Sequence, residues 1–383
     1  MSLTQGRLMK ILYTNFHRGD GGGHTTYIGT LARSLGSAHE ITVAVPGTSR
    51  LYHELSQAPG VRVADLDYPT RLSRLAGSAA RLGRLVDDGG FDIVHANGSA
   101  DHRCVMFSRL LHTARRRPRV VFTKHDHRNY TGLGATLRAR LATDHVIAVS
   151  DDSYQRLAAS AYRRCPLTLV RNGIDTERYR PWTDDAVAQA RAPWLQDGET
   201  RLIVGSNAGT AEYKNWIEMV QAVALLPEAL RRQVRVVLAG HPPSAQQLER
   251  VRALGLADRV HFTGLVQDVR PVVAAFDIGF VLSNQIETIS FACREMMAMG
   301  KPVIVSRFGG LPENVDDGRD GWVAGPGNPQ AVADLLAQAL RDPQRLAPMG
   351  RAARAKSERA FSVAGFVRQT EQVYEDVLRA AAG

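Results

Sequence analysis

The residues best suited to chemistry are two carboxylates, Glu287 and Glu295, which stand eight positions apart around Ser290. Ser290 is predicted to cap a short helix by accepting a backbone N–H, and Gly300 to end that helix in a left-handed conformation. Glu287 then lies in the loop before the helix, whereas Glu295 lies more than one turn inside it. We therefore expect the two carboxylates to reach different parts of one ligand that lies across the helix start.

The expected ligand combines a phosphate with hydroxyl groups. A helix start offers unpaired N–H groups and the positive end of the helix dipole, which suit a phosphate. A carboxylate gains nothing beside a phosphate, but it accepts strong hydrogen bonds from sugar hydroxyls. The stretch thus indicates a nucleotide sugar, with one glutamate on the donor sugar and the other on the ribose. Two surface glutamates beside an ordinary helix are the alternative, which the Gly300–Val305 run and Gly309-Gly310 make less favoured.

Length and composition set the broad limits. A chain of 383 residues is expected to form two domains. It contains no run of eighteen uncharged apolar residues, so we predict neither a transmembrane helix nor a secretory signal peptide. Its three cysteines, Cys104, Cys165 and Cys293, show no metal-binding spacing. These features favour a cytoplasmic protein with free thiols.

The charge is distributed unevenly along the chain. Residues 1–175 contain 24 Lys and Arg against 14 Asp and Glu, a net charge of +10, whereas residues 176–383 contain 24 of each kind. The first half is therefore expected to face something acidic, such as a membrane surface or a phosphorylated glycan. Nucleic acid is not predicted as a partner, because no recognised motif or aromatic stacking pattern accompanies the charge.

Short apolar runs alternate with helical stretches in both halves, which is typical of parallel sheets covered on both faces. The fold class is therefore α/β, with two doubly wound, Rossmann-like domains facing across a cleft and ligands at the carboxyl ends of the strands. Turn signals at 172–181 divide the chain into domains 1–175 and 176–362, and the last helix, about 363–383, is expected to return to the first domain. The predicted strands are 9–14, 41–45, 92–95, 119–123, 145–149, 202–204, 234–239, 260–263, 278–282 and 303–305.

Two more segments are expected near a phosphate. Gly21-Gly22-Gly23 follows the first strand and precedes a helix that begins near Thr25, so the backbone there can approach a ligand closely. Lys214 precedes Asn215, which is interpreted as a helix cap with Glu218 in the capping-box position. Lys214 is then placed to offset the charge of a leaving diphosphate. A flexible surface loop and a surface lysine are the respective alternatives.

Two histidines and an Asp-x-Asp motif are candidates for binding a sugar or a metal ion. His125 and His127 follow the strand that ends at Thr123. We favour a sugar contact or a proton transfer there over a metal site, because no third ligand is evident. Asp65-Leu66-Asp67 has the form of a metal-holding Asp-x-Asp, but it lies in a surface-like strand that ends at Tyr68-Pro69. We assign no metal to it.

The stretch from Arg71 to Leu85 places four arginines and four leucines at helical spacing and predicts an amphipathic basic helix. Two interpretations stay open. In one, the leucines pack into the core and the arginines are solvated. In the other, Arg71, Arg74, Arg81 and Arg84 contact an anionic membrane, so that the protein lies peripherally on the inner face of the cytoplasmic membrane. The net charge of the first half slightly favours the second.

Taken in order along the chain, these segments resemble the retaining glycosyltransferases of family four, which have the two-domain GT-B fold and include bacterial lipopolysaccharide-core and glycolipid glycosyltransferases. The resemblance covers nearly the whole chain. It rests on Gly22-Gly23 with Tyr27-Ile28, Thr123-Lys124-His125, Arg171-Asn172-Gly173-Ile174-Asp175, Lys214-Asn215, the pair Glu287 and Glu295, and Gly309-Gly310-Leu311-Pro312-Glu313.

The resemblance implies roles for individual residues. Lys214 would hold the donor diphosphate, Glu287 the sugar hydroxyls and Glu295 the ribose diol. With His125 beside the donor sugar, the predicted catalytic residues are His125, Glu287 and Lys214. The resemblance also implies that the enzyme needs no cofactor and no metal. The predicted donor-binding residues are Gly22, Gly23, Ser206, Asn207, Lys214, Thr288, Ile289, Ser290 and Glu295.

Three positions depart from the pattern of the family. Where the family usually has a Gly-Arg pair, Gly205 is followed by Ser206-Asn207, so the second phosphate cation is replaced by Arg294 or Arg307, or by nothing. The segment after the first glutamate is Thr288-Ile289-Ser290 instead of a Gly-Phe-Gly-like run, which implies a tighter pocket.

The third departure concerns the acceptor. The family position near Thr25 often helps to hold the acceptor, and here it offers only a hydroxyl. Thr25 and His127 are accordingly the predicted acceptor-binding residues.

The sequence therefore predicts an enzyme that moves a hexose-like sugar from a nucleoside diphosphate to an acceptor hydroxyl with the anomeric configuration kept. The charge asymmetry suggests an acidic, membrane-attached acceptor such as a lipopolysaccharide or another glycolipid. Two alternatives stay open: a nucleotide-sugar 2-epimerase, which needs no acceptor, and an inactive nucleotide-sugar-binding protein, which the missing arginine would allow.

Overall fold

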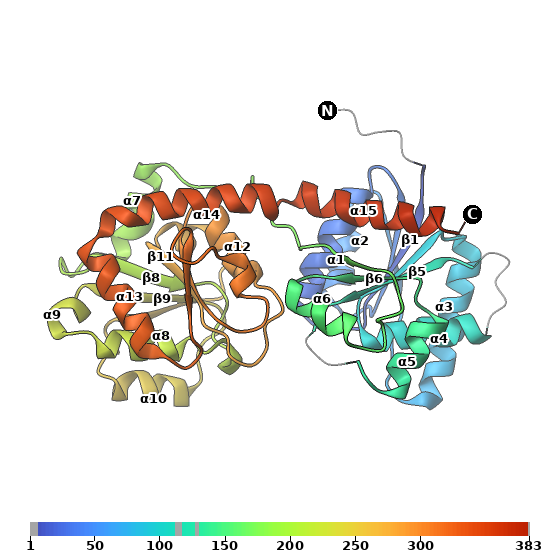
Figure 1. Cartoon of the computed structure of the whole chain (residues 1–383), viewed down its shortest axis with the longest axis horizontal. Helices are drawn as coiled ribbons and strands as arrows, with labels where there is room; N and C mark the ends of the chain where they lie inside the picture. Colours follow the sequence, from blue (N-terminus) through green and yellow to red (C-terminus); the bar gives the residue numbers. More distant parts are fainter. Residues whose placement is uncertain (1–6, 112–116, 127–129, 382–383) are drawn as a thin grey trace. The chain divides into compact units, whose positions relative to one another are not determined.

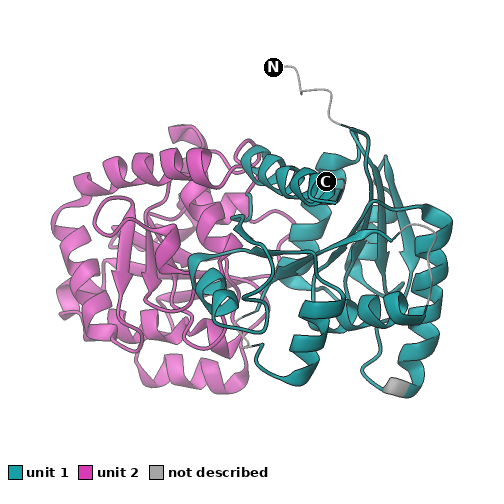
Figure 2. Cartoon of the chain, turned by 45° about the vertical axis from the view of Figure 1, so that its right-hand side comes forward, with its two compact units in different colours: residues 1–173, 363–383 teal, residues 174–362 magenta. Residues whose placement is uncertain are grey.

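The computed structural model describes residues 7–111, 117–126 and 130–381 of the chain. Its internal contacts divide the chain into two compact units (Figure 2). Unit 1 comprises residues 1–173 and 363–383, and unit 2 comprises residues 174–362. Each unit is a parallel sheet covered by helices, which is the α/β class expected from the alternating pattern (Figure 1).

Seven parallel strands form the sheet of unit 1 in the order β3-β2-β1-β4-β5-β6-β7. The strands are β1 (Lys10–Thr14), β2 (Glu40–Val45), β3 (Val61–Asp65), β4 (Ile93–Ala96), β5 (Arg119–Lys124), β6 (His145–Ala148) and β7 (Leu167–Leu169). The helices of this unit are α1 (Gly22–Leu35), α2 (Arg50–Ser56), α3 (Leu72–Gly89), α4 (Ser99–Leu111), α5 (Leu133–Leu141), α6 (Asp151–Ala158) and α15 (Val363–Arg379).

Six parallel strands form the sheet of unit 2 in the order β10-β9-β8-β11-β12-β13. The strands are β8 (Leu202–Ser206), β9 (Val234–Ala239), β10 (Val260–Gly264), β11 (Ile278–Val281), β12 (Val303–Ser306) and β13 (Gly321–Ala324). The helices are α7 (Asp184–Arg191), α8 (Ile217–Leu225), α9 (Glu228–Arg231), α10 (Ala245–Ala253), α11 (Arg270–Ala274), α12 (Phe291–Ala298), α13 (Pro329–Arg341) and α14 (Leu346–Ala360), with 3₁₀ turns η1 (Ala192–Trp194), η2 (Glu212–Lys214), η3 (Pro312–Asn314) and η4 (Pro343–Arg345).

In both sheets the strand order reverses at one internal point. The reversal lies between β1 and β4 in unit 1 and between β8 and β11 in unit 2. Helices leave toward opposite faces on the two sides of such a point, so a crevice opens at the carboxyl ends of the two strands, and ligands bind there in open α/β sheets. The topology therefore fixes, in each unit, which loops are able to form a site.

The ten strands predicted from apolar runs all form, with ends shifted by no more than two residues. Three further strands form: β3, where a surface-like strand ending at Tyr68-Pro69 was expected, and β7 and β13, which were not predicted. All three lie at an edge of their sheet, and every residue of β3 and β7 is partly or fully exposed. A partly solvated strand lacks the continuous apolar run of a strand that is buried on both faces, so the sequence signal for β3 and β7 is weak. Strand β13 is short and largely buried.

The last helix, α15, belongs to unit 1, although it follows unit 2 in the sequence. The Tyr374 hydroxyl lies 2.9 Å from that of Tyr13 and 2.6 Å from His95 Nδ1, in the interior of unit 1. The Phe366 ring packs against the Tyr27 ring at a centroid distance of 5.0 Å. Helix α15 thus completes the core of unit 1 beside α1, β1 and β4.

Helix α3 carries the arginines that were considered for membrane contact. Its leucines Leu75 and Leu82 are buried in the core of unit 1, whereas Arg74 and Arg84 are exposed. Arg81 donates a hydrogen bond to the carbonyl of Asp65 at 2.9 Å. Leu75 and Leu82 are therefore used by the core, and the interpretation with a solvated arginine face describes this helix better than a membrane-facing apolar one.

The two carboxylates of the Asp-x-Asp motif form contacts with nearby loops of unit 1. Strand β3 ends at Asp65 and does not continue to Tyr68-Pro69 as expected. Asp65 accepts a hydrogen bond from the Gly47 N–H at 2.7 Å, and Asp67 pairs with Arg18 at 3.1 Å. Both carboxylates hold neighbouring loops of unit 1.

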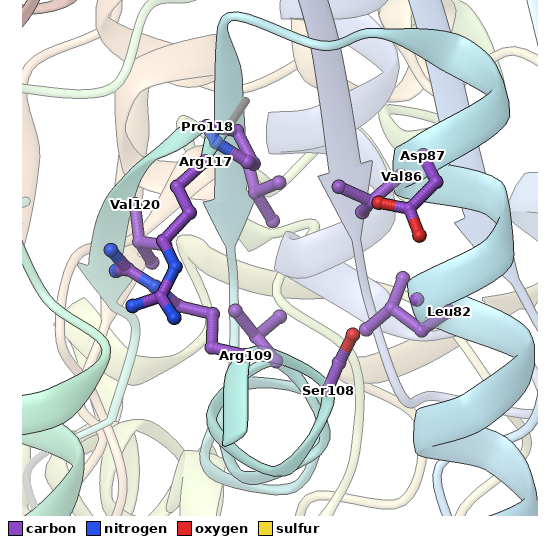
Figure 3. Close-up of a pocket in the computed structure, with 11 residues that line it drawn as sticks. Leu82, Val86, Asp87, Ser108, Arg109, Arg117, Pro118 and Val120 are labelled. Atoms are coloured by element: carbon purple, nitrogen blue, oxygen red, sulfur yellow. The ribbon is translucent and has the colours of Figure 1, made fainter. Parts of the chain in front are cut away.

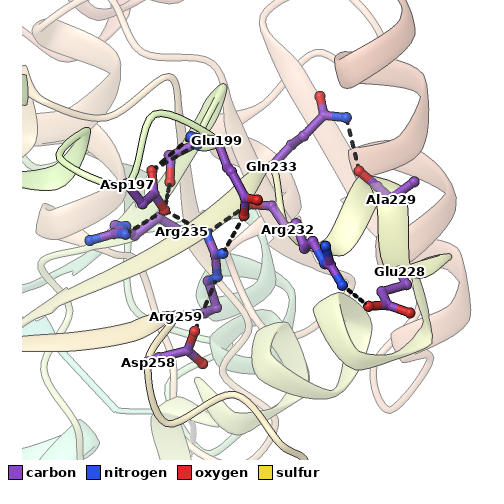
Figure 4. A network of polar contacts seen from close by, with 10 residues as sticks. Asp197, Glu199, Glu228, Ala229, Arg232, Gln233, Arg235, Asp258 and Arg259 are labelled. Carbon is purple, nitrogen blue, oxygen red and sulfur yellow. Dashed lines mark hydrogen bonds and ion pairs between the residues drawn. The ribbon is translucent and has the colours of Figure 1, made fainter.

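An ion-pair network connects the amino ends of β8, β9 and β10 in unit 2 (Figure 4). Asp197, just before β8, accepts from Arg235 of β9 at 2.8 Å and from Arg259, just before β10, at 2.6 Å. Arg259 also donates to Glu199 at 2.9 Å. The network lies at the edge of the sheet opposite to the carboxyl ends, so we assign it to the stability of unit 2.

Gly205 in β8 provides a test of the packing beneath the carboxyl end of this strand. A Cβ atom at this position would lie 2.1 Å from the ring of the buried Phe276. We expect Gly205→Ala to lower the free energy of unfolding by about 1–3 kcal/mol, because the buried ring would have to shift to admit the added methyl group. Chemical denaturation followed by circular dichroism measures the change.

Gly325→Ala in the same unit is the matched control, because a Cβ there meets nothing closer than 4.0 Å. Equal stability of the two variants would contradict the packing argument.

Candidate functional site

In unit 2, most of the residues predicted to bind the donor gather where the strand order reverses. Ser206 ends β8, Asn207 follows it, and Glu287 lies in the loop after β11. The N-cap of α12 is Ser290, whose Oγ accepts the Cys293 N–H at 3.2 Å as predicted. The N–H groups that precede the capped one have no partner within the helix, and they stand at the positive end of its dipole.

The end of α12 and the loop after β12 complete this arrangement. Gly300 follows the helix with φ of 74°, which confirms the left-handed stop. Gly309 has φ of 53°, and a Cβ atom there would lie 2.0 Å from the carbonyl oxygen of Glu287. The Gly309-Gly310 pair therefore allows the loop after β12 to pack directly on the backbone of Glu287.

The central contact of the site is an ion pair between Lys214 and Glu287. Lys214 Nζ donates to Glu287 Oε2 at 2.8 Å, and Ser283 Oγ donates to the same oxygen at 3.0 Å. The side chains of Lys214 and Glu287 are only 16% and 7% exposed. Separate contacts with the donor were expected for these two residues, whereas in the structure they contact each other.

The helix cap predicted beside Lys214 was wrong. Lys214 ends the 3₁₀ turn η2, Asn215 has a left-handed backbone with φ of 51°, and α8 begins two residues later at Ile217. The Asn215 amide donates to Glu218, whose carboxylate in turn accepts the N–H groups of Gly327 and Asn328. The left-handed turn at Asn215, and not a capping box, sets the position of Lys214.

Glu295 forms the second polar contact of the site. It accepts a hydrogen bond from Asn207 Nδ2 at 2.5 Å and another from the hydroxyl of Tyr179. Burial raises the pKa of Glu295, although these two hydrogen bonds and Arg178 act in the opposite direction. Tyr179 was missed by the sequence analysis, because nothing in its neighbourhood in the chain indicates that it meets Glu295.

Arg294 does not replace the phosphate-binding arginine that is common in the family. It is fully buried, its Nε donates to Asn314 Oδ1 at 2.8 Å, and its guanidinium lies 4.1 Å from the centre of the Phe361 ring. Asn314 in turn donates to the carbonyl of Gly310 at 3.2 Å. Arg294 thus fixes α12 to the glycine loop, whereas the other candidate, Arg307, is exposed after β12.

Unit 1 has its own polar group at the reversal point of its sheet. Gly21 and Gly22 have positive φ angles of 67° and 48°, and α1 begins at Gly22, three residues before the predicted start at Thr25. Thr25 is buried and donates to the carbonyl of Asp20 at 2.6 Å. Gly23 lies in the exposed first turn of α1.

His125, which follows β5, lies among these residues. Its ring is 4.3 Å from that of His24 and 4.5 Å from that of Tyr27, measured between centroids, and its Nε2 lies 3.1 Å from Asn97 Oδ1. Burial lowers the pKa of His125 well below its usual value, so the ring is neutral at neutral pH. Its predicted companion, His127, lies outside the described residues.

Several buried polar atoms near His125 have no hydrogen-bond partner among the described residues. They are the amide nitrogen and oxygen of Asn15, Nε2 of His17 and Nδ1 of His24. Leaving buried polar atoms unsatisfied is costly, and a polyhydroxylated ligand is able to satisfy them. Asn15 and His17 directly follow β1, and this position after a strand at the reversal point is the signal that would have identified them.

A small apolar cavity elsewhere in unit 1 is not part of either group. It has a volume of about 30 Å³ between α3, α4 and the beginnings of β4 and β5, and Arg109 and Arg117 lie at its side (Figure 3). None of the predicted site residues lines it. Within the described parts of the chain, no group of three or more His, Cys, Asp and Glu side chains has an arrangement that could hold a metal ion.

Two family models match the chain. The model described as Glycosyltransferase Family 4 matches residues 21–178, and the model described as Glycosyl transferases group 1 matches residues 199–342.

Two curated relatives and one crystal structure illustrate the similarity. The GDP-mannose-dependent alpha-(1-6)-phosphatidylinositol monomannoside mannosyltransferase of Mycolicibacterium smegmatis is 28% identical over 90% of this chain and 92% of its own length. The lipopolysaccharide core biosynthesis mannosyltransferase LpsB of Rhizobium meliloti is 29% identical over 68% and 73%. Anabaena Alr3699/HepE in complex with UDP superposes with a TM-score of 0.82 at 22% identity, covering 96% of this chain and 100% of that one.

The ion pair at the centre of the site is testable by a double-mutant cycle. We expect Lys214→Met and Glu287→Gln each to lower the free energy of unfolding by about 1–3 kcal/mol, because each leaves a largely buried polar partner behind. The double variant should lose clearly less free energy of unfolding than the sum of the losses in the two single variants. Denaturant unfolding of the unaltered protein and the three variants gives the coupling energy. Additive losses would mean that the two side chains do not interact in solution.

Proposed function

Because the chain belongs to glycosyltransferase family 4 and has the GT-B fold, we propose that this glycosyltransferase moves a hexose from a nucleoside diphosphate to a hydroxyl of a membrane-associated glycan, with the anomeric configuration kept. The observation that carries the proposal is the arrangement at the reversal point of unit 2. There, one cation, two carboxylates and the start of α12 converge on the carboxyl ends of β8 and β11.

The proposed donor site uses these groups as follows. The diphosphate lies against the start of α12, where N–H groups of Thr288, Ile289 and Ser290 and of the first helical turn face it. Lys214 exchanges its bond to Glu287 for one to the phosphate oxygens, and it stabilises the charge that grows on the leaving diphosphate. Glu287 then accepts hydrogen bonds from hydroxyls of the sugar.

Glu295 is proposed to hold the ribose. Its carboxylate already accepts two hydrogen bonds, from Asn207 and Tyr179, and the ribose diol offers two more donors. The Asn207 Oδ1 atom is buried without a hydrogen-bond partner among the described residues, so it is an acceptor available to the nucleotide. Since Lys214 and N–H groups supply the positive charge, the proposal requires no cofactor and no metal ion.

In unit 1, His125 is proposed to contact the donor sugar, and Thr25 to lie beside the acceptor. Because the His125 ring is neutral, it is able to donate one hydrogen bond and accept another, as a sugar hydroxyl requires. No carboxylate in either group is an evident covalent nucleophile, so we favour attack on the same face, assisted by the departing phosphate.

Two features support the choice of substrates. The M. smegmatis relative is named for GDP-mannose and a phosphatidylinositol mannoside, and the R. meliloti relative for the lipopolysaccharide core. The Anabaena structure contains UDP. GDP-mannose and UDP-glucose are therefore the first donors to test, with lipopolysaccharide-core and glycolipid acceptors. No structural feature favours the epimerase or an inactive binder.

Substitutions of the two glutamates should have different effects, on nucleotide affinity for Glu295 and on turnover for Glu287. We expect Glu295→Ala to weaken nucleotide affinity by about ten- to a hundredfold, because it removes charge-assisted hydrogen bonds. Glu287→Ala should lower kcat by about a hundredfold with a smaller effect on affinity. Calorimetric titration and acceptor-dependent release of GDP or UDP measure the two effects, and NMR of the product shows its anomeric configuration.

Glu249→Gln on α10 serves as the control, because Glu249 is an exposed carboxylate of the same unit. Normal kinetics in both alanine variants, or an epimerised donor formed without acceptor, would overturn the assignment.

Nucleotide binding should also depend on pH through Glu295. Its hydrogen bonds to the ribose diol are charge-assisted only when the carboxylate is ionised, and its pKa lies above that of an ordinary glutamate. Affinity should therefore be complete well above the raised pKa and fall as the pH is lowered through it, beginning at a higher pH than for an exposed glutamate. Nucleotide titrations between pH 4.5 and 7.5 compare the unaltered protein with Glu295→Gln, whose affinity should lack this fall at low pH. Parallel curves of affinity against pH for the two proteins would refute the role of Glu295 in binding the ribose.

A further inference from the structure

Helix α5 of unit 1, which Figure 1 labels, carries large apolar side chains that are exposed. Leu133, Leu137 and Leu141 are 76%, 39% and 43% exposed. They recur every fourth residue, so they lie along one face of the helix. Ala135 and Ala139, on the other side, are buried in the core of unit 1. The alanines of α5 therefore pack in the core, and its leucines are exposed to solvent.

The end of helix α4 adds two more exposed leucines. Leu110 and Leu111 are each 58% exposed. Arg109, next to them, pairs with Asp144 at 3.4 Å, and Asp144 lies three residues after the end of α5. The ion pair therefore holds the end of α4 against the segment that follows α5. Leu110, Leu111, Leu133, Leu137 and Leu141 are called the leucine face below.

Exposed basic side chains lie on or beside the segments that carry these leucines. Arg140 is exposed on α5 itself, and Arg117 is exposed just before β5. A second copy of this face would bring like charges together, whereas an anionic surface would be attracted to them. Exposed leucines bordered by arginines are the composition of segments that lie in a membrane interface.

We propose that the leucine face docks unit 1 onto a bilayer that contains anionic lipid. The leucines enter the boundary between headgroups and acyl chains, and the arginines contact the lipid phosphates. This surface differs from the one expected from the sequence, because the buried leucines of α3 are committed to the core. Among the described residues, no helix combines the length and apolar character needed to cross a bilayer, so the docking is peripheral.

The inference deepens the proposed function, since it supplies the surface by which the protein would reach a membrane-attached acceptor. The test is independent of that function, because flotation needs neither donor nor acceptor. The full chain is mixed with vesicles of phosphatidylcholine alone or with 30% phosphatidylglycerol, and the fraction that floats is measured. We expect binding to the anionic vesicles only, and weaker binding as the salt concentration rises.

The triple variant Leu133→Gln, Leu137→Gln, Leu141→Gln should lower the partition coefficient at least about thirtyfold, because each leucine contributes to burial in the interface. Glutamine keeps the helix propensity of α5, and the three positions are not part of the core. Arg117→Gln with Arg140→Gln should lower it about tenfold or more. Unchanged circular dichroism and thermal midpoints verify that the variants are folded.

The double variant Leu225→Gln, Leu265→Gln is the matched control, because these leucines are 50% and 68% exposed on unit 2. It should float like the unaltered protein. Absence of flotation, or equal flotation of the triple variant, overturns the proposal. So does a dimer in vesicle-free ultracentrifugation that the triple variant converts to a monomer, because the leucine face would then serve self-association. Failure of the transferase assay alone leaves this result unaffected.

Discussion

The ion pair between Lys214 and Glu287 is the contact on which the proposed donor site depends. It joins the loop after β8 to the loop after β11, which are the two strands beside the reversal point of unit 2. Because both side chains are largely buried, removing either one leaves a partner without its hydrogen bond in a region of low dielectric. The pair connects the two loops, and in the proposed donor site a diphosphate would compete with Glu287 for the lysine.

The two units present different chemistry at equivalent places in their sheets. Unit 2 gathers charge: a lysine, two glutamates and a helix start. Unit 1 gathers neutral polar groups around His125, since burial lowers the pKa of His24 to about 3 and that of His125 well below its usual value. The lysine and the helix start suit a diphosphate, the two carboxylates suit hydroxyl groups, and a neutral set of donors and acceptors also suits hydroxyl groups. This division agrees with a donor whose nucleotide belongs to unit 2.

Much of the fold follows from local signals in the chain. Buried parallel strands are short apolar runs, so ten of the thirteen strands were predictable, and the cap at Ser290 and the stop at Gly300 follow from side-chain chemistry and glycine geometry. Strands β3 and β7 carry a weaker signal because their residues are partly solvated. The predicted helix cap at Asn215 was wrong, because Asn215 forms a left-handed turn and α8 begins two residues later. Asparagine is common both in helix caps and in left-handed turns, so residue type alone does not distinguish them.

The sequence by itself determined the fold class, the family and the residues that flank α12, because these depend on periodicity and on groups close together in the chain. Only the tertiary structure decided which partner each polar group takes: Lys214 with Glu287, Glu295 with Asn207 and Tyr179, and Arg294 with Asn314. It also decided that Leu75 and Leu82 of α3 are buried and that the leucines of α5 are exposed. Both helices have similar composition, and burial depends on what packs against a helix, which the local sequence does not contain.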